Sequence, residues 1–411
     1  MSRKWVEKES PLWIERGIVS RDQVNQILSL YEDKKHAIGL LPILGSLLVG
    51  LGILSFIAAN WQYIPEIARL TMIIVFMAAF YTGGETLLRR GHEKLGMAIV
   101  SLGVISFGAG IILIGQMFHL VAYNAFSFIL WASAGTLTAY LYRSRYLYLI
   151  GLLLFNAAQI YSVSEFDTFS YAAFVLMLAG LGWYAWQQRS PLLIGCLAFS
   201  VTLHSMLWTT SGEFKFIWMF IPAMALYTIG DWVKDRTERF ALQFAPLVAA
   251  FIFGMFMVLF PLDWAGSHLN DYLRAQPATY LTLLAILFVL SVAGKLRSGA
   301  GAVSSAFEWI LLAPYLYLPD GIELLYLLAL FFFSLYVLWR GYAEEWRFKI
   351  NVGTVLFIVA TLIAYGKLTW DFMDKSLFFI IGGVLLLLLS WFLNRRKKQF
   401  FHDGREGGER P

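Results

Sequence analysis

The stretch that decides the fold is residues 95–119, LGMAIVSLGVISFGAGIILIGQMFH, which contains no Asp, Glu, Lys or Arg. As a helix that rises 1.5 Å per residue it would measure about 37 Å. This length exceeds the ~30 Å hydrocarbon core of a bilayer. A run of this length and polarity predicts a transmembrane helix.

The same apolar character extends over the whole chain of 411 residues. Hydrophobic residues make up 59% and charged residues only 14%, and the mean hydropathy is +0.66. Soluble domains carry about 25% charged residues, and a soluble domain could not bury this much apolar surface. An outer-membrane barrel would instead show segments of about ten residues with alternating polarity. The composition therefore predicts an all-α, polytopic transmembrane bundle and excludes both other classes.

Apolar runs of the length that spans a bilayer, about 17–25 residues, recur along the chain. We count fourteen: 39–61, 67–88, 95–119, 124–142, 146–163, 169–187, 191–210, 216–233, 240–260, 277–294, 301–318, 322–339, 348–366 and 376–394. The eleventh contains Glu308 and Pro314 and is the least regular of them.

The distribution of Lys and Arg predicts the direction of these spans. With the N-terminus inside, most of the 32 basic residues fall on segments that face the cytoplasm, as the positive-inside rule requires. Without the eleventh span, the basic run at 395–398 would lie outside, so parity favours fourteen spans with both termini cytoplasmic. The pI of about 9.1 then reflects topology, and we expect no nucleic-acid partner.

Three parts follow from this map. A cytoplasmic helical hairpin covers 1–38, the transmembrane bundle covers 39–394, and a basic, disordered cytoplasmic tail covers 395–411. The polar start of the chain contains no pattern of a cleavable secretory signal, so the first apolar run is expected to remain as an anchor.

Helix-capping signals define the N-terminal hairpin. Ser10 and Pro11 predict the start of a first helix, and Gly17 predicts its left-handed end. Ser20 and Gln23 have the spacing of a capping box at the start of a second helix. A hairpin this small must pack on something. Two alternatives remain open, namely the protein's own inner loops and a partner protein.

Several short stretches carry a resemblance to a known family. They are Trp13 with 17–20 (Gly-Ile-Val-Ser), Leu47, 57–62 (Ile-Ala-Ala-Asn-Trp-Gln), Arg69, 115–119 (Gly-Gln-Met-Phe-His), 351–353 (Asn-Val-Gly), Ser376 with Leu377, and Arg395 with Arg396. These stretches resemble the bacterial membrane proteins catalogued as domain of unknown function 2157, more closely at both ends of the chain than in its middle. The resemblance implies a location in the bacterial inner membrane. Since the family has no established activity, it implies no catalytic residue.

Polar side chains at membrane depth are costly unless they pair or line a cavity. Eight of them fall on the outer side of the predicted bundle: Asn60, Gln62, Gln116, His119, Asn124, Asn156, Gln159 and His204. Gln116 with His119, and Asn156 with Gln159, have i, i+3 spacing, so each pair shares one face of its helix. One interpretation is an outward-facing vestibule that binds a polar or lipid-linked ligand. The alternative is ordinary hydrogen bonding between helices.

Glu308 is the acidic residue that lies deepest in a predicted span. It sits about seven residues into the eleventh run, roughly 10 Å deep at 1.5 Å per residue. At that depth a carboxyl group could bind and release a proton during transport, or it could reach a basic side chain of an inner loop.

Other polar residues receive structural interpretations. Glu85 with Arg89, and Asp231 with Lys234, are interpreted as charged pairs that flank the inner ends of spans. His119 and His204 have no carboxylate or cysteine nearby in the predicted map, so we expect no metal site and no cofactor.

Two functions are compatible with this sequence. The first is a carrier or permease-like protein for a polar or lipid-linked solute, since the chain has many spans, short loops and a layer of polar residues. The second is a membrane scaffold or sensor that binds a partner protein through the N-terminal hairpin. We expect no enzyme, because apart from Glu308 the spans offer no convincing pair of catalytic groups.

Overall fold

The computed structural model describes residues 3–29, 48, 55, 64–211, 214–260, 276–297, 306–318, 322–369, 374–377, 380–384 and 387. The described residues are 85% helical and contain no strand. The chain divides into two compact units, Met1–Met72 and Ile73–Pro411. Most of the predicted span 39–61, including Asn60, lies outside the described residues, as do Gln62 and the predicted tail 395–411.

The first unit contains two short helices that contact each other, α1 (Arg3–Glu15) and α2 (Arg21–Ser29). Gly17 has a φ of +66°, a left-handed conformation that glycine adopts without strain. The Gln23 backbone N donates to Ser20 Oγ at 3.2 Å, and the Ser20 backbone N donates to Gln23 Oε1 at 2.8 Å. The predicted capping box at the start of α2 is therefore confirmed.

The predicted start of the first helix is wrong. The helix α1 begins at Arg3 and continues through Pro11, whereas Ser10 and Pro11 predicted a start there. Residues 3–9 are mostly good helix formers, and one proline removes only one backbone hydrogen bond of the helix. The favourable segment before Pro11 therefore extends the helix toward the N-terminus.

Thirteen more helices follow in the described residues. They are α4 (Glu66–Arg89), α5 (Glu93–Met117), α6 (Phe126–Tyr142), α7 (Arg145–Phe166), α8 (Tyr171–Leu176), α9 (Trp183–Gln188), α10 (Pro191–Thr210), α11 (Phe220–Trp232), α12 (Arg236–Leu259), α14 (Pro277–Arg297), α16 (Trp309–Leu312), α17 (Ile322–Ala343) and α18 (Arg347–Thr369). A π-helical turn (Met177–Gly182) joins α8 to α9, and a 3-10 turn (Phe216–Met219) precedes α11.

Eight of these helices are long and apolar enough to cross a membrane: α4, α5, α7, α10, α12, α14, α17 and α18. Apart from the first, the eleventh and the last, each predicted span coincides with a helix, with a helix and its adjoining turn, or, for 169–187, with α8, the π-helical turn and α9 together. The prediction of an all-helical chain with several membrane-spanning helices is confirmed. The number of fourteen spans stays a prediction.

The eleventh predicted span differs from the prediction. Within residues 306–318 the longest helix is the single turn α16, and the chain then continues without regular structure to Leu318. Pro314 explains this ending, because it has no N–H to donate and it disfavours a helical conformation of Ala313. The expectation of an ordinary helix over 301–318 is therefore wrong for its described part.

This irregular segment nevertheless runs along α14. At one end the Trp309 Nε1 donates to Ser291 Oγ at 2.9 Å, and at the other the Tyr317 ring packs on Tyr280 with centroids 5.7 Å apart. Ser291 and Tyr280 are eleven residues apart on α14, about 16 Å of helix. Trp309 and Leu316 are buried. Irregular backbone at membrane depth is tolerated where it is buried in protein.

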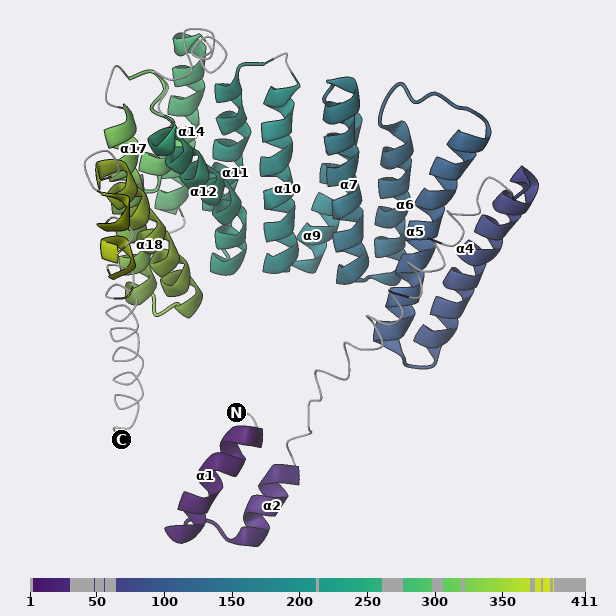
Figure 1. Cartoon of the computed structure of the whole chain (residues 1–411), viewed down its shortest axis with the longest axis horizontal. Coiled ribbons are helices and arrows are strands. Elements are labelled where there is room, and N and C mark those ends of the chain that lie inside the picture. Colours follow the sequence, from purple (N-terminus) through teal and green to yellow (C-terminus); the bar gives the residue numbers. More distant parts are fainter. Residues whose placement is uncertain are drawn as a thin grey trace. The chain divides into compact units, whose positions relative to one another are not determined.

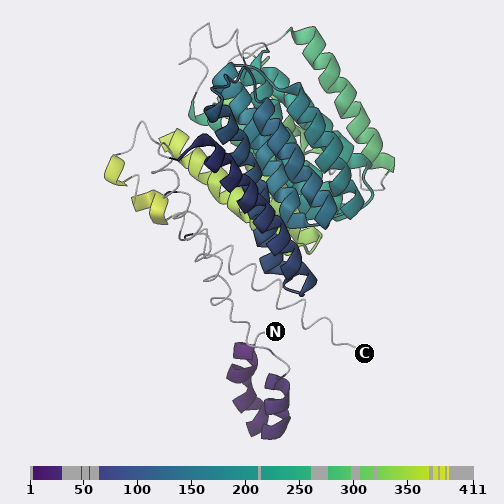
Figure 2. The same ribbon diagram turned by 90° about the vertical axis from the view of Figure 1, so that its right-hand side faces the viewer.

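The helices of the second unit pack side by side as one bundle. Figure 1 shows α5, α6, α7, α10 and α11 standing next to one another, and Figure 2 shows the same packing after a turn of 90°. Its buried apolar residues form two clusters, the first mainly from α6 to α10 and the second from α11 to α18. Short connections between consecutive helices make these neighbours antiparallel.

Basic residues gather at one end of this bundle, the lower end in Figure 1. The turns at 143–144, 189–190, 233–235 and 344–346 lie there. We call it the basic end, since its turns and adjoining helix ends carry Arg143, Arg145, Arg189, Lys234, Arg236, Lys295, Arg297, Arg340, Arg347 and Lys349.

Candidate functional site

A buried ion pair lies at the basic end, between the last turns of α11 and α14. Asp231 Oδ1 and Lys295 Nζ are 2.8 Å apart, and the two side chains are only 3% and 2% exposed. Asp231 also accepts hydrogen bonds from Ser291 Oγ and from Gln243 Nε2. A buried charge is tolerated where it is paired and hydrogen-bonded in this way.

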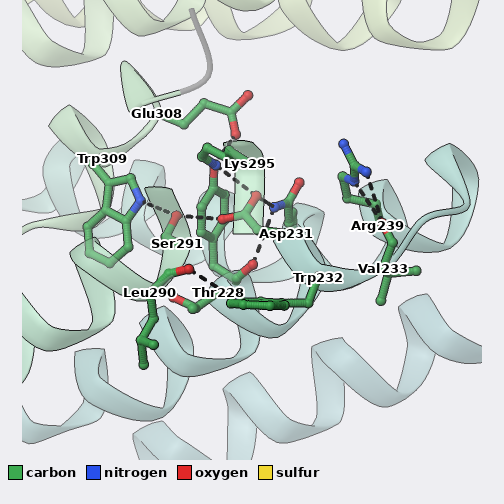
Figure 3. A network of polar contacts seen from close by, with 12 residues as sticks. Thr228, Asp231, Trp232, Val233, Arg239, Leu290, Ser291, Lys295, Glu308 and Trp309 are labelled. Atoms are coloured by element: carbon green, nitrogen blue, oxygen red, sulfur yellow. Dashed lines mark hydrogen bonds and ion pairs between the residues drawn. The ribbon is translucent and has the colours of Figure 1, made fainter. Parts of the chain in front are cut away.

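The ion pair continues into a chain of hydrogen bonds that ends at Glu308. Lys295 Nζ also donates to Tyr227 Oη at 2.8 Å, and Tyr227 Oη donates to Glu308 Oε2 at 2.6 Å. Figure 3 shows Asp231, Lys295 and Glu308 along this network, with Ser291 bridging to Trp309. Side chains from α11, α14 and the segment before α16 are thus linked.

Two glycines let these helices approach each other. A Cβ added to Gly294 on α14 would lie 2.9 Å from Trp232 Nε1 and 3.1 Å from Asp231 Cβ, and one added to Gly230 would lie 2.8 Å from Gln243 Cγ. Small residues allow transmembrane helices to pack this closely. The sequence therefore brings α12 and α14 against α11 where the ion pair forms.

A second charged cluster surrounds Glu344 in the turn between α17 and α18. Its carboxylate pairs with Arg236 at 2.7 Å, with Arg340 at 2.6 Å and with Lys349 at 3.4 Å. Burial alone would raise the pKa of Glu344, but the positive charges of Lys349 and Arg340 outweigh it and hold the pKa below its usual value. One carboxylate thus holds three cations.

Both clusters line a single cavity of about 460 Å³. The cations among its described lining residues are Lys234, Arg236, Arg239, Lys295, Arg340 and Lys349, and the acids are Asp231, Glu308 and Glu344. Cations therefore outnumber acids. A cleft of one dominant charge with low-dielectric walls concentrates ions of the opposite charge, so this cavity suits an anion.

Three of the residues predicted for an outer vestibule lie at the end of α5 and in the loop after it. Gln116, His119 and Asn124 are exposed. Asn124 Oδ1 accepts a hydrogen bond from the Phe126 backbone N at 3.0 Å, which forms an Asx turn just before α6.

Three others lie between α7 and α10. Asn156 Nδ2 donates to Ser200 Oγ at 2.8 Å, and the buried Gln159 amide lies against the backbone of Ser170. His204 is buried beside the Phe174 ring, with centroids 5.8 Å apart.

The two groups of vestibule residues are separate in the hydrogen-bond network. No hydrogen bond within the described part of the chain joins Asn156, Gln159 or His204 to Gln116, His119 or Asn124. None of these six lines the charged cavity. A ligand at these residues stays a prediction.

One of the two predicted charged pairs is confirmed, and the other is wrong. Arg89 Nε and Glu85 Oε1 are 2.9 Å apart, which confirms that pair. The assignment of Asp231 to Lys234 is wrong in its partner, since Asp231 pairs with Lys295. The reason is that α11 ends at Trp232 with Asp231 turned into the bundle, whereas Lys234 lies beyond the helix end and is exposed.

Sequence reasoning gave no role to Lys295, Tyr227 or Lys349. The predicted tenth span stops at residue 294, one residue before Lys295. One signal was available, because Asp231 and Lys295 carry opposite charges at the same predicted inner boundary. Their pairing still depends on which helices pack together, and the sequence pattern does not determine that.

Metal ligands do not gather in the part of the chain that the structure describes. No group of three or more His, Cys, Asp or Glu side chains there could hold a metal ion.

Comparison with known proteins bears on the N-terminal third of the chain. Residues 11–148 match the family Predicted membrane protein (DUF2157). The resemblance to DUF2157 is thereby confirmed for this part, which extends from α1 into α7. The match ends before α11, so the cavity lies outside it. No curated protein and no solved structure matches this chain. The chain is a membrane protein with several apolar helices.

Proposed function

We propose that this membrane protein is a carrier for an anionic compound, which binds in the cavity at the basic end. The observation that carries the proposal is the 460 Å³ volume of this cavity together with its excess of cations over acids. Volumes of about 300–1,000 Å³ are usual for small-molecule sites. This site replaces the outer vestibule as the leading location for the ligand.

The irregular segment at 306–318 supports a carrier. In many secondary transporters, the substrate site is formed where a membrane segment is interrupted, because the interruption exposes polar groups at membrane depth. Here the segment brings Glu308 into the wall of the cavity, next to Tyr227. If residues 306–318 formed a continuous spanning helix, the segment would offer no interruption of this kind.

The direction of loading follows from the charge distribution. Lys and Arg are enriched on cytoplasmic segments of inner-membrane proteins, and the turns of the basic end carry Arg143, Arg189 and Lys234. We therefore place the basic end in the cytoplasm of a bacterial cell, with the membrane-spanning bundle in the inner membrane. The carrier would receive its anion from the cytoplasmic side.

We propose a proton-binding role for Glu308 within this carrier. An anion in the cavity would favour the protonated, neutral carboxyl group, since two negative charges would otherwise share a low-dielectric site. The titratable and charged groups that surround Glu308 come from four helices: Tyr227 and Asp231 of α11, Lys295 of α14, Tyr336 and Arg340 of α17, and Lys349 of α18. Movement of the anion would then be accompanied by movement of a proton.

Transport by reconstituted protein tests the proposal. The full chain is placed in phosphatidylcholine vesicles, which are given radiolabelled phosphate, radiolabelled succinate or a fluorescent phosphatidic acid. The wild type should move at least one of these probes faster than protein-free vesicles. The variant Lys234→Gln/Arg236→Gln, which removes two exposed lining cations, should lose about 90% of that rate.

The matched control is Arg297→Gln, at an exposed arginine on α14 that does not line the cavity. This variant should transport like the wild type. Vesicles that move none of the three probes above background would contradict the carrier, as would an equal loss in the Arg297→Gln control.

A scaffold that binds a partner protein is the second candidate. It is favoured by the division of the chain, in which α1 and α2 belong to a compact unit that does not include α5 to α18. Deletion of residues 1–36 distinguishes the two functions. Loss of a co-purified protein with unchanged transport would favour the scaffold, whereas a change confined to transport rates would favour the carrier.

A further inference from the structure

The charged residues that line the cavity come from turns and helix ends of the basic end, and we call this charged part of the cavity its mouth. Arg236 is the first residue of α12, Lys349 is near the start of α18, and Arg340 is in the last turn of α17. Lys234 lies in the turn before α12 and is exposed. An anionic group that enters the cavity therefore meets its cations within the first turns of the surrounding helices.

Beyond the mouth the wall of the cavity is apolar. Leu247 and Phe251 continue it along α12, Phe333 and Val337 along α17, and Leu356 along α18. Each of the first two pairs has i, i+4 spacing and so shares one helix face. From Arg236 to Phe251 the wall extends about 22 Å along α12 at 1.5 Å per residue.

A small free anion would use only one end of this space. Apolar walls offer no hydrogen-bonding partners, and a cavity without two or more polar partners does not hold water well. A hydrocarbon chain would instead gain free energy from contact with Leu247, Phe251 and Leu356. A cavity wall that is charged at one end and apolar at the other thus matches a molecule with one anionic end and one apolar end.

We infer that the ligand of this cavity is an anionic lipid, whose phosphate or carboxylate lies among Lys234, Arg236 and Lys349 and whose hydrocarbon chain lies between α12, α17 and α18. The inference rests on the proposed function, because it names the class of compound that the carrier would move. The charge of the mouth selects the anionic head, and the apolar wall selects the chain.

Three soluble probes test separately whether binding requires the anionic head group and whether it requires the hydrocarbon chains. Dihexanoyl phosphatidic acid has the anionic head and short chains, glycerol 3-phosphate has the head alone, and dihexanoyl phosphatidylcholine has the chains with a zwitterionic head. Native mass spectrometry of the full chain in maltoside detergent measures the affinity for each. Because each buried CH₂ group contributes about fourfold, phosphatidic acid should bind at least tenfold more tightly than glycerol 3-phosphate. It should also bind at least tenfold more tightly than phosphatidylcholine.

Variants at the two ends of the cavity should have different effects. Leu247→Asn makes the wall polar, so it should weaken the binding of phosphatidic acid about tenfold and leave the binding of glycerol 3-phosphate unchanged. Lys234→Gln/Arg236→Gln should weaken the binding of both probes. Leu259→Asn is the matched control, since Leu259 is on the same helix, exposed and absent from the lining of the cavity.

The possible results separate this inference from the proposed function. Equal binding of phosphatidic acid and glycerol 3-phosphate would overturn the inference of a lipid ligand and would leave the proposal of an anion carrier. Equal binding of phosphatidic acid and phosphatidylcholine would overturn the requirement for an anionic head. No binding of any probe would overturn both proposals. If Leu247→Asn bound phosphatidic acid like Leu259→Asn, the placement of the chain would be wrong.

Discussion

At the scale of single residues, the side chain of Lys295 holds the charged network together. Its Nζ contacts both Asp231 Oδ1 and Tyr227 Oη at 2.8 Å. Lys295→Met would leave the Asp231 carboxylate buried without its cation, which should lower the free energy of unfolding by about 3–5 kcal/mol. Thermal unfolding of the purified protein in uncharged detergent measures this loss.

The double variant Asp231→Asn/Lys295→Met supplies the control. It removes both charges, and the new amide oxygen can still accept the hydrogen bond from Gln243 Nε2, so the double variant should recover part of the lost stability. Lys234→Met, at an exposed cation of the same cavity, should have little effect. If Lys295→Met were no less stable than Lys234→Met, the buried ion pair would not make this contribution to the free energy of unfolding.

The proposed proton-binding role predicts a specific effect at Glu308. Glu308→Gln keeps an oxygen that accepts the hydrogen bond from Tyr227 Oη but cannot bind a proton. Anion transport by the wild type should depend on pH and be accompanied by proton uptake, whereas transport by Glu308→Gln should lose both properties. Rates in vesicles with a trapped pH indicator measure them.

Glu85→Gln is the matched control for this prediction. It changes an acidic residue of an exposed pair with Arg89, so the pH dependence of transport should stay that of the wild type. A Glu308→Gln variant with unchanged pH dependence and unchanged proton uptake would assign proton binding to another group.

The carboxylate of Glu344 makes stability depend on pH. Because its pKa lies below the ordinary value of 4.5 in the folded protein, its contribution is present above that value and is lost as the pH falls through the lowered pKa. Glu344→Gln should therefore lower stability at neutral pH by roughly 1.5–3 kcal/mol. The difference from the wild type should shrink as the pH falls below 4.5 and vanish once the pH is below the lowered pKa. Unfolding curves at several pH values measure it, and a difference that is constant with pH would contradict this account.

Sequence reasoning identified some residues of the site and missed their partners. Asp231 and Glu308 were recognisable because charged residues near or within apolar runs are costly. The partners Lys295 and Tyr227 could not be assigned, since each belongs to a helix whose neighbours depend on the packing of the whole bundle. Lys349 and Arg340 had no individual role, since they were only counted among the basic residues that set the direction of the spans.

At the scale of helices, close packing of α17 on α18 forms one wall of the cavity. A Cβ on Gly353 would lie 2.7 Å from both Cα and N of Leu338, so Gly353→Ala must push the two helices apart. Overpacking of this kind costs about 1–3 kcal/mol, and we expect a loss of that size together with weaker anion binding.

Gly366→Ala is the control on the same helix. No heavy atom lies within 4 Å of the position of its Cβ, so the change in stability should stay within about 0.5 kcal/mol. Thermal unfolding in detergent compares the two variants. Equal stabilities would contradict the close approach of α17 and α18 at Gly353.

The positions of the helices could largely be predicted from the sequence, because runs of apolar residues follow the thickness of a bilayer. The segment at 306–318 could not, since hydrophobicity alone predicts a helix there and Pro314 ends it. Pro11 shows the opposite case, in which α1 continues through a proline that had predicted its start.

At the scale of the whole molecule, the orientation of the basic end is open to a direct test. Cys196 is the chain's one cysteine, so a Cys196→Ser background allows single cysteines to be introduced. Glu345→Cys in the turn after α17 should react with a membrane-impermeant maleimide only after the cells are permeabilised. Thr168→Cys, in the turn after α7 at the opposite end, should react in intact cells, and the reverse pattern would place the basic end outside.

An all-helical membrane protein could be predicted from composition alone, since 14% charged residues cannot cover a soluble surface. The number of spans depends on segments such as 306–318, which run along the bundle without forming a continuous helix. The location of the proposed ligand site depends on packing between helices that are far apart in sequence, such as α12 and α18.

The cavity at the basic end is proposed to receive an anionic group. The most direct measurement is an experimental structure of the full chain with dihexanoyl phosphatidic acid. We expect the phosphate within hydrogen-bonding distance of Arg236 and Lys349, with the chains between α12 and α18. An empty cavity at saturating lipid, or a phosphate at Asn156 and His204 instead, would contradict it.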